Sequence, residues 1–256
     1  LFGGNPRALA VSPDGSRVYA AFALSGNATT IVARHLVPPP PAVGEGGLRP
    51  IFSGGLAPVT LLLWVCFATT LMANYFLNSW MPVLFEEMGV TPAQAALATS
   101  IYHFGGLAGG LLMSVLLDRF GFLAMGVLLV LGAPALLAIG IPGMPAWGLI
   151  TLVTFAGFAV LGAQFGGNAA AGLIYPTDAR GKGVGLAFAA GRIGSVLGPF
   201  IGAMMFGLDT SPIWLLLTMA GPLLLGAIAA FLLARMSHSR FGGWRIREIG
   251  AERSGI

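Results

Sequence analysis

From about residue 56 onward the sequence consists of long apolar runs separated by short polar turns. A helix needs about 20 apolar residues to cross the hydrocarbon core of a bilayer. Only 9% of the 256 residues are charged, whereas soluble domains typically carry about 25%, so this chain could not cover a surface that faces water. We therefore predict an all-α membrane protein in a lipid bilayer, with six spans at about 56–81, 93–117, 121–141, 145–174, 183–207 and 212–236.

Residues 1–37 have a different pattern from the apolar block. The run from Ala8 to Ala20 predicts a strand, a Pro-Asp-Gly turn and a second strand. It resembles one hairpin of a surface-layer-type β-propeller, whose blades repeat an "SPDG…VY" pattern. We divide the chain into this hairpin fragment, a Pro- and Gly-rich linker at 38–55, the six-span block at 56–236 and a basic tail at 237–256. A membrane-anchored propeller binding protein is an alternative, which requires several more such repeats upstream.

The positions of Lys and Arg predict the orientation in the membrane, because cytoplasmic loops carry an excess of these residues. From Arg49 onward, nine of the ten basic residues precede the first span, follow the second or fourth span, or lie in the tail. The turns after the first, third and fifth spans carry none. We expect both ends of the block to be cytoplasmic in a bacterial plasma membrane. This distribution explains the net charge of +4 without a nucleic-acid partner.

The turn after the second span contains the run Leu117-Asp118-Arg119-Phe120-Gly121. It resembles the Asp-Arg-x-Gly loop motif between helices 8 and 9 of the major facilitator superfamily. A carboxylate at a cytoplasmic helix end can face the positive end of another helix and an arginine, and we include Arg180 in this predicted gate. The match is partial, since Ser114 replaces the family's glycine and two apolar residues replace its basic pair. An ordinary solvated turn is the alternative.

A second motif narrows the resemblance. The run Tyr175-Pro-Thr-Asp-Ala-Arg-Gly-Lys-Gly-Val-Gly185, followed by Gly191-Arg-Ile-Gly-Ser-Val-Leu-Gly-Pro199, is similar to a stretch of the aromatic acid:proton symporters. The segments at 74–82 and 162–168 resemble helices 7 and 10 of that family. The resemblance implies the second six-helix half of a carrier whose first half is missing, symport of an aromatic or related organic acid, and a proton as coupling ion. Sugar acids, dicarboxylates and expelled drugs are alternative cargoes.

Two ionisable side chains are expected near the middle of the bilayer. Arg192 lies about nine residues into the fifth predicted span, about 13 Å deep at 1.5 Å per residue, and His103 lies about 15 Å into the second. A charged residue at that depth is a candidate for function. We expect Arg192 to help bind a carboxylate and His103 to take part in proton coupling. A structural ion pair or snorkelling for Arg192, and a packing role for His103, are the alternatives.

Four amides complete the candidate site, in two pairs with the same spacing. Asn74 and Asn78 are four residues apart on one predicted helix, and Gln164 and Asn168 are four apart on another, so each pair shares a helix face. Buried amides need hydrogen-bond partners, from another helix or from a ligand. The sequence contains no nucleophile–base pair and no metal-ligand spacing among its histidines and its single cysteine. We therefore expect no enzyme, no metal and no cofactor.

Glycines recur every four residues within two of the predicted spans. Gly194, Gly198 and Gly202 form one strip, and Gly105 and Gly109 belong to another. Missing side chains let helix backbones approach closely in membranes. We predict close helix packing at both strips.

Overall fold

The computed structural model describes residues 6–11, 18–22, 48–141, 143–175, 177–208, 211–241 and 246. The chain forms two compact units, residues 1–47 and 48–256. In the first unit, β1 (Pro6–Val11) pairs antiparallel with β2 (Val18–Phe22), with Val11 opposite Val18 and an irregularity between Pro6 and Ala8. The two strands of the expected hairpin are thus present. The predicted Pro-Asp-Gly turn and most of the predicted linker lie outside the described residues.

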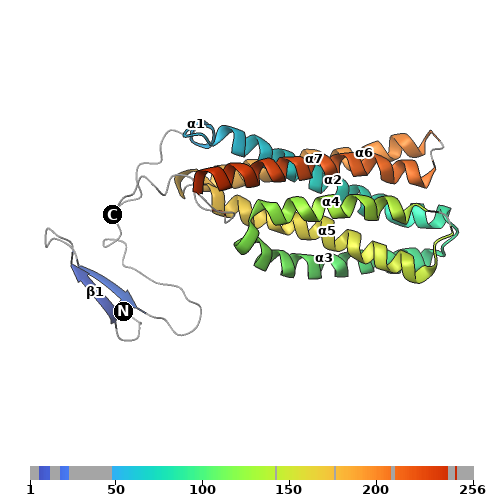
Figure 1. Ribbon diagram of the computed structural model, residues 1–256, viewed down its shortest axis with the longest axis horizontal. Helices are drawn as coiled ribbons and strands as arrows, with labels where there is room; N and C mark the ends of the chain where they lie inside the picture. The colour runs from blue at the N-terminus through green and yellow to red at the C-terminus, as the bar shows by residue number, and fades with distance from the viewer. Residues whose placement is uncertain are drawn as a thin grey trace. The chain divides into compact units, whose positions relative to one another are not determined.

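The second unit is an α-helical bundle. Its helices are α1 (Arg49–Phe52), α2 (Ala57–Glu87), α3 (Pro92–Phe120), α4 (Phe122–Ile139), α5 (Ala146–Ile174), α6 (Thr177–Phe206) and α7 (Pro212–Phe241). Within the described residues, six helices, α2 to α7, are long and apolar enough to cross a membrane. Each runs antiparallel to its neighbour in sequence (Figure 1). The prediction of six membrane helices is confirmed.

Several helices extend beyond the predicted spans, α2 and α6 the furthest. The first span was expected to end near residue 81, but α2 continues through Pro82 to Glu87. The fifth was expected to begin near residue 183, but α6 begins at Thr177 and includes Lys182. Hydropathy marks where lipid contact ends, whereas backbone hydrogen bonding can continue into the polar boundary. A proline is also tolerated in a membrane helix, where neighbouring groups can compensate for the lost bond.

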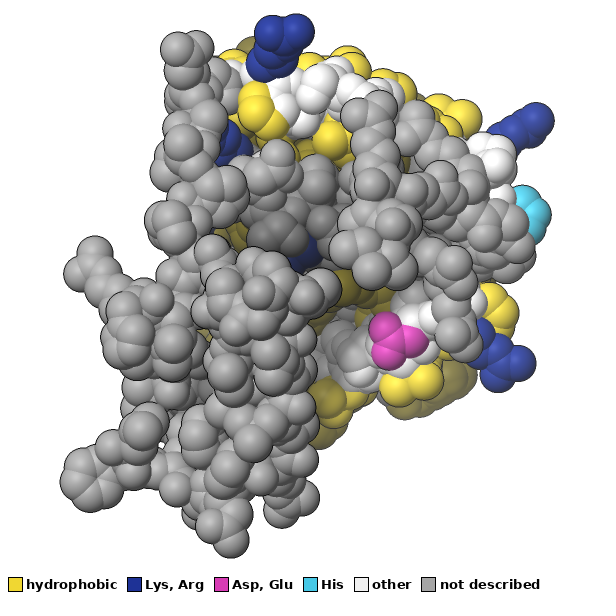
Figure 2. Space-filling model, turned by 90° about the vertical axis from the view of Figure 1, so that its left-hand side faces the viewer, with side chains coloured by type: hydrophobic (Ala, Val, Ile, Leu, Met, Phe, Trp, Pro, Cys, Tyr) yellow, Lys and Arg dark blue, Asp and Glu magenta, His cyan; other side chains and the backbone are white. Residues whose placement is uncertain are grey.

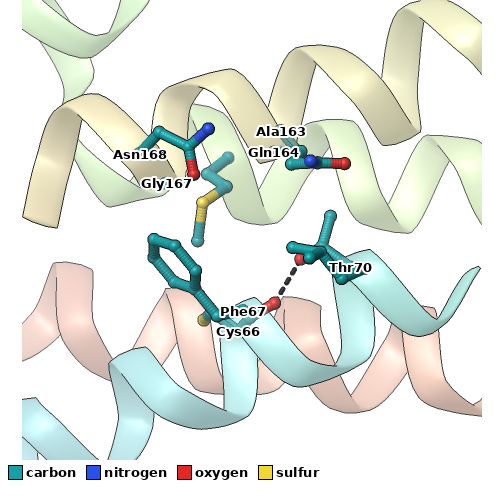
Figure 3. Close-up of a pocket in the computed structure, with 9 residues that line it drawn as sticks. Cys66, Phe67, Thr70, Ala163, Gln164, Gly167 and Asn168 are labelled. Atoms are coloured by element: carbon teal, nitrogen blue, oxygen red, sulfur yellow. Dashed lines mark hydrogen bonds between the residues drawn. The ribbon is translucent and has the colours of Figure 1, made fainter. Parts of the chain in front are cut away.

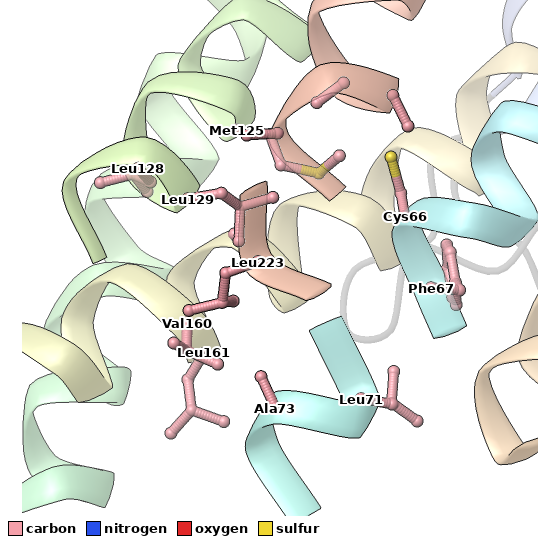
Figure 4. Packing of buried hydrophobic residues seen from close by; sticks show 14 of the residues in the cluster. Cys66, Phe67, Leu71, Ala73, Met125, Leu128, Leu129, Val160, Leu161 and Leu223 are labelled. Atoms are coloured by element: carbon pink, nitrogen blue, oxygen red, sulfur yellow. The ribbon is translucent and has the colours of Figure 1, made fainter. Parts of the chain in front are cut away.

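Helix packing in the bundle follows the small residues. The most extensive contacts join α3 to α5, α2 to α6 and α4 to α7. At several glycines an added Cβ would collide with a backbone carbonyl oxygen of the facing helix, namely Gly105, Gly109, Gly157, Gly194 and Gly198. Close packing at the two predicted glycine strips is therefore confirmed. An apolar core fills the interior, where Ala73 of α2 lies toward Val160 and Leu161 of α5 and Leu223 of α7 (Figure 4).

Candidate functional site

Arg192 lies midway along α6, which spans Thr177–Phe206. Because the helix begins earlier than expected, Arg192 is 15 residues, about 22 Å, from its first residue rather than about 13 Å. Its side chain is exposed in this bundle. The guanidinium Nη1 donates a hydrogen bond of 3.1 Å to the hydroxyl oxygen of Tyr75 on α2. The charge is therefore held across the α2–α6 contact, near the middle of both helices.

His103 belongs to a chain of hydrogen bonds between α2 and α3. Its Nε2 lies 2.8 Å from Oδ1 of Asn78. The amide nitrogen of Asn78 donates to Oδ1 of Asn74 at 2.9 Å, and the hydroxyl of Tyr102 donates to the same oxygen at 3.1 Å. Tyr102 is fully buried and Asn74 is 7% exposed, whereas His103 is exposed. The chain thus runs from the interior of the bundle to an accessible imidazole.

The two predicted ionisable residues contact the same face of α2. Arg192 bonds Tyr75 and His103 bonds Asn78, and these α2 positions are three residues apart, so they are neighbours on the helix surface. Arg192 comes from α6 on one side, and His103 comes from α3 on the other. The sequence placed both at similar depth. The structure adds that both side chains bond neighbouring residues of α2, so they belong to one group of polar residues.

A pocket lies between α2 and α5, on the first half of α2. The space between its walls is small, of the order of a single water molecule. Figure 3 shows Gln164 and Asn168 on α5, across from Phe67 and Thr70 on α2. The side-chain oxygens of Gln164 and Asn168 are buried and have no hydrogen-bond partner among the described residues. The remaining lining is formed by Cys66, Leu71, Met125, Ala163 and Gly167.

The pocket and the chain of hydrogen bonds that ends at His103 lie along one side of α2. Thr70, Asn74 and Asn78 follow at intervals of four, so they share a helix face, and Thr70 is about 12 Å from Asn78 along the axis. All six candidate binding or coupling residues therefore lie on, or pack against, a common stretch of α2.

Sequence reasoning missed Tyr102 and the pocket residues of α2. Tyr102 could have been found, because a hydroxyl in the middle of an apolar span needs a hydrogen-bond partner. Phe67 and Thr70 gave no such signal, since aromatic and β-branched residues are ordinary in a membrane helix. The Thr70 hydroxyl donates to the backbone carbonyl of Cys66, within its own helix. Only the position of α5 identifies these residues as pocket lining.

The predicted gate residues lie at one end of the bundle, where Lys and Arg side chains are found near its edge together with an acidic group (Figure 2). Gly121 alone links α3 to α4, and its φ of +56° explains why glycine is required there. Asp118 is exposed and is not bonded to a described residue. The Arg119 guanidinium lies 5.4 Å from the centre of the Phe120 ring. Nε of Arg180 donates to the carbonyl oxygen of Tyr175 at 3.3 Å.

These features define an integral membrane protein built as an antiparallel six-helix bundle, with a cation, an imidazole and amides gathered near its middle. The profile of the Major Facilitator Superfamily matches residues 63–247. The chain belongs to this superfamily.

Three relatives, all named as transporters, have similar sequences. The 3-(3-hydroxy-phenyl)propionate transporter of Escherichia coli K12 is 35% identical over 191 residues, which cover 73% of this chain and 46% of the relative. The 4-hydroxybenzoate transporter PcaK of Pseudomonas aeruginosa is 33% identical over 75% of this chain and 43% of its own length. The gallate transporter of Pseudomonas putida is 29% identical over the same two shares, 75% and 43%. The chain thus spans less than half the length of these curated relatives.

A solved structure has the same fold. It is a bacterial homologue of the human lysosomal transporter Spinster in an inward-facing, unoccupied conformation. The TM-score is 0.60 at 19% identity, over 78% of this chain and 52% of that chain. At this identity the likeness concerns the fold alone.

Proposed function

We propose that this chain is the second six-helix half of a carrier that moves an aromatic or related organic acid across a bacterial inner membrane together with a proton. The names of its relatives support this cargo class, since they specify hydroxyphenylpropionate, hydroxybenzoate and gallate. The residues around α2 support it independently. Arg192 binds the carboxylate, the α2–α5 pocket widens to receive the ring when the solute binds, and His103 exchanges the proton.

The observation that carries the proposal is the charge of Arg192. It lies in the middle of α6, and every acidic residue of the chain lies near a helix end, in a turn or in a terminal segment. Within the described residues its hydrogen-bond partner is the neutral hydroxyl of Tyr75. A cation at that depth is costly unless it is paired or hydrated. The planar fork of an arginine suits a carboxylate, so an anionic solute supplies the missing charge.

The α2–α5 pocket suits a ring that carries a hydroxyl group. Phe67 and Leu71 offer apolar contact, and Gln164 and Asn168 offer side-chain oxygens that have no partner. A carboxamide has both acceptor and donor atoms, and a phenolic hydroxyl can donate and accept. The ring substituent therefore finds a partner whichever way each amide is turned.

The missing first half packs, in this proposal, on α3 and α6. Only 33% and 28% of the central windows of these two spans are buried, against 61% for α2 and α4. Large apolar side chains are exposed on both, with Phe104, Leu107 and Leu111 on α3 and Ile193, Val196 and Phe200 on α6. Cargo held between two such halves is exposed to each side of the membrane in turn when they rock.

The gate and the orientation belong to the same proposal. Asp118 lies in the last turn of α3, where the negative end of the helix dipole disfavours a carboxylate. Contact with a basic group or a helix N-terminus of the other half, formed when the cytoplasmic side is closed, offsets that cost. The end with Arg119, Arg180 and Lys182 faces the cytoplasm. Labelling of the segment around Arg180 from outside intact cells contradicts this orientation.

The test is uptake of radiolabelled 4-hydroxybenzoate, 3-(3-hydroxyphenyl)propionate and gallate by the full-length carrier. We expect Arg192→Ala to abolish uptake and Arg192→Lys to reduce it strongly, because lysine keeps the charge but loses the fork. Arg235→Lys, at an exposed site on α7, is the matched control and retains uptake. Undiminished uptake in both Arg192 variants contradicts the role of Arg192. Competition by sugar acids, dicarboxylates or drugs, with none by aromatic acids, contradicts the cargo.

A further inference from the structure

The orientation of the Asn78 side chain is fixed by a partner that can only accept. Its Nδ2 atom lies 2.9 Å from the backbone carbonyl oxygen of Asn74 and 2.9 Å from Oδ1 of the same residue. A backbone carbonyl has no hydrogen to donate, so the atom that faces it must be the NH₂ group. Turning the amide around would place two oxygens against each other.

The orientation of Asn78 determines the protonation of His103. With its nitrogen committed to Asn74, Asn78 presents Oδ1 to Nε2 of His103, at 2.8 Å. A carboxamide oxygen accepts only, so Nε2 must carry a hydrogen. In the neutral imidazole the lone pair then belongs to Nδ1. The hydrogen bond to Asn78 therefore selects one of the two tautomers.

The hydrogen-bond chain that ends at His103 begins in the interior of the bundle. Oδ1 of Asn74 accepts from the Tyr102 hydroxyl as well as from Asn78, so the Asn74 amide cannot be turned around without setting two donor groups against each other. The buried Tyr102 ring stands edge-on to the His103 ring, with 5.4 Å between centroids. The imidazole is thus held by Asn78 at Nε2 and by Tyr102 beside the ring.

We propose that Asn78 is a positioning residue that holds His103 with its hydrogen on Nε2, so that Nδ1 is the atom that takes up and releases the proton during transport. Proton uptake forms one N–H bond at Nδ1 and gives an imidazolium ion, while the Nε2–H bond to Asn78 is retained. Release breaks only the Nδ1–H bond. This assignment rests on the proposed role of His103 in coupling.

Apart from the buried Tyr102, the residues described below that face His103 cannot exchange a proton in its place. On α3 its titratable neighbour is the buried Tyr102, and on α2 the residue facing it is the neutral Asn78. Tyr75, one turn away on α2, accepts the hydrogen bond of Arg192 from α6. Helix α5, which packs on α3, contains no Asp, Glu, His, Lys, Arg, Cys or Tyr.

The test is a measurement of which imidazole nitrogen carries the hydrogen, made by NMR on the chain labelled with ¹⁵N-histidine in lipid nanodiscs. Spectra are recorded over a range of pH, and the tautomer is assigned from those in which the imidazole is neutral. The His103 signals are those missing from His103→Gln. We expect one tautomer, with Nε2–H protonated and its proton slow enough in exchange to be seen. If the spectrum of the unmodified protein shows the hydrogen on Nδ1, the proposal is wrong, and no variant is needed to decide it.

Variants at the neighbouring positions separate the hydrogen bond from the fold. Asn78→Leu removes the acceptor, so the Nε2–H proton should exchange too fast to be seen and the second tautomer should appear. Ser79→Ala, at an exposed neighbouring position, is the control and should leave the signals unchanged. An unchanged His103 spectrum in Asn78→Leu overturns the role of Asn78.

Transport measurements distinguish this inference from the proposed function. If the full-length carrier with His103→Gln still accumulates substrate in response to a proton gradient, the coupling role of His103 is wrong, whatever the tautomer. If that variant loses coupling while the parent shows the Nδ1–H tautomer, the coupling role stands and the positioning role of Asn78 is wrong.

Discussion

The two amide pairs of the bundle have the same spacing but opposite hydrogen bonding. Asn74 and Asn78 on α2 are bonded to each other, to Tyr102 and to His103. Gln164 and Asn168 on α5 leave their buried side-chain oxygens without a partner. A buried acceptor without a partner costs about 1–3 kcal/mol, whereas a bonded one contributes modestly. The difference supports our proposal that the α2 pair builds the site and that the α5 pair is available to a ligand.

The largest expected effect comes from displacing Tyr102, whose hydroxyl donates to Asn74 of the bonded pair. Gly157 on α5 lies against the backbone carbonyl of Tyr102, and an added Cβ would collide with that oxygen. We expect Gly157→Ala to destabilise the bundle by about 1–3 kcal/mol or more, because α3 and α5 must separate. Unfolding can be followed in detergent by the reaction of a thiol dye with the single buried cysteine, Cys66.

The control for this variant is Gly172→Ala on the same helix, where an added Cβ meets nothing within 4 Å. It should leave the unfolding temperature close to that of the parent, or raise it slightly because alanine favours the helix. Equal unfolding temperatures for Gly157→Ala and Gly172→Ala would show that the close approach of α3 and α5 does not hold Tyr102 in place.

The second prediction compares the two pairs directly, by replacing one asparagine of each with leucine. Asn74→Leu leaves the Tyr102 hydroxyl and the Asn78 amide without their acceptor, so we expect a loss of about 1–3 kcal/mol. Asn168→Leu removes an oxygen that has no partner and should be neutral or stabilising. The measurement is again thermal unfolding followed at Cys66. Similar losses for both variants would mean that Asn168 has a partner in the folded protein.

Much of this architecture could be predicted from the sequence, because a bilayer allows few alternatives. Runs of about 20 apolar residues predict spans, and the glycine strips predict where helices approach. Arg192 and His103 were predicted as candidate site residues because polar groups are costly at that depth, and their roles stay predictions. The difference between the amide pairs could not be predicted, because a spacing of four fixes only a shared face. Whether Asn168 meets a partner depends on which residues of α2 and α4 lie opposite.

The third prediction concerns ligand selectivity in the full-length carrier. Gln164→Met and Asn168→Leu should each weaken binding of 4-hydroxybenzoate about tenfold, equivalent to about 1.4 kcal/mol and so to one lost hydrogen bond. Binding of benzoate, which has no ring hydroxyl, should change little. The measurement is competition against labelled substrate in membrane vesicles. Equal weakening for both ligands would indicate that the pocket holds the ring by shape alone and that its amides do not bond the hydroxyl.

The smallest expected effect separates two tyrosines that flank the bonded pair. Tyr75 is 37% exposed and accepts from Arg192, whereas Tyr102 is fully buried and donates to Asn74. Replacement by phenylalanine removes only the hydroxyl at each site. We expect Tyr75→Phe to change stability by less than about 0.5 kcal/mol, because water can replace the lost partner, and Tyr102→Phe to cost about 1 kcal/mol. A larger loss for Tyr75→Phe than for Tyr102→Phe would mean that the Arg192 contact, rather than the buried amide chain, holds the centre of the bundle together.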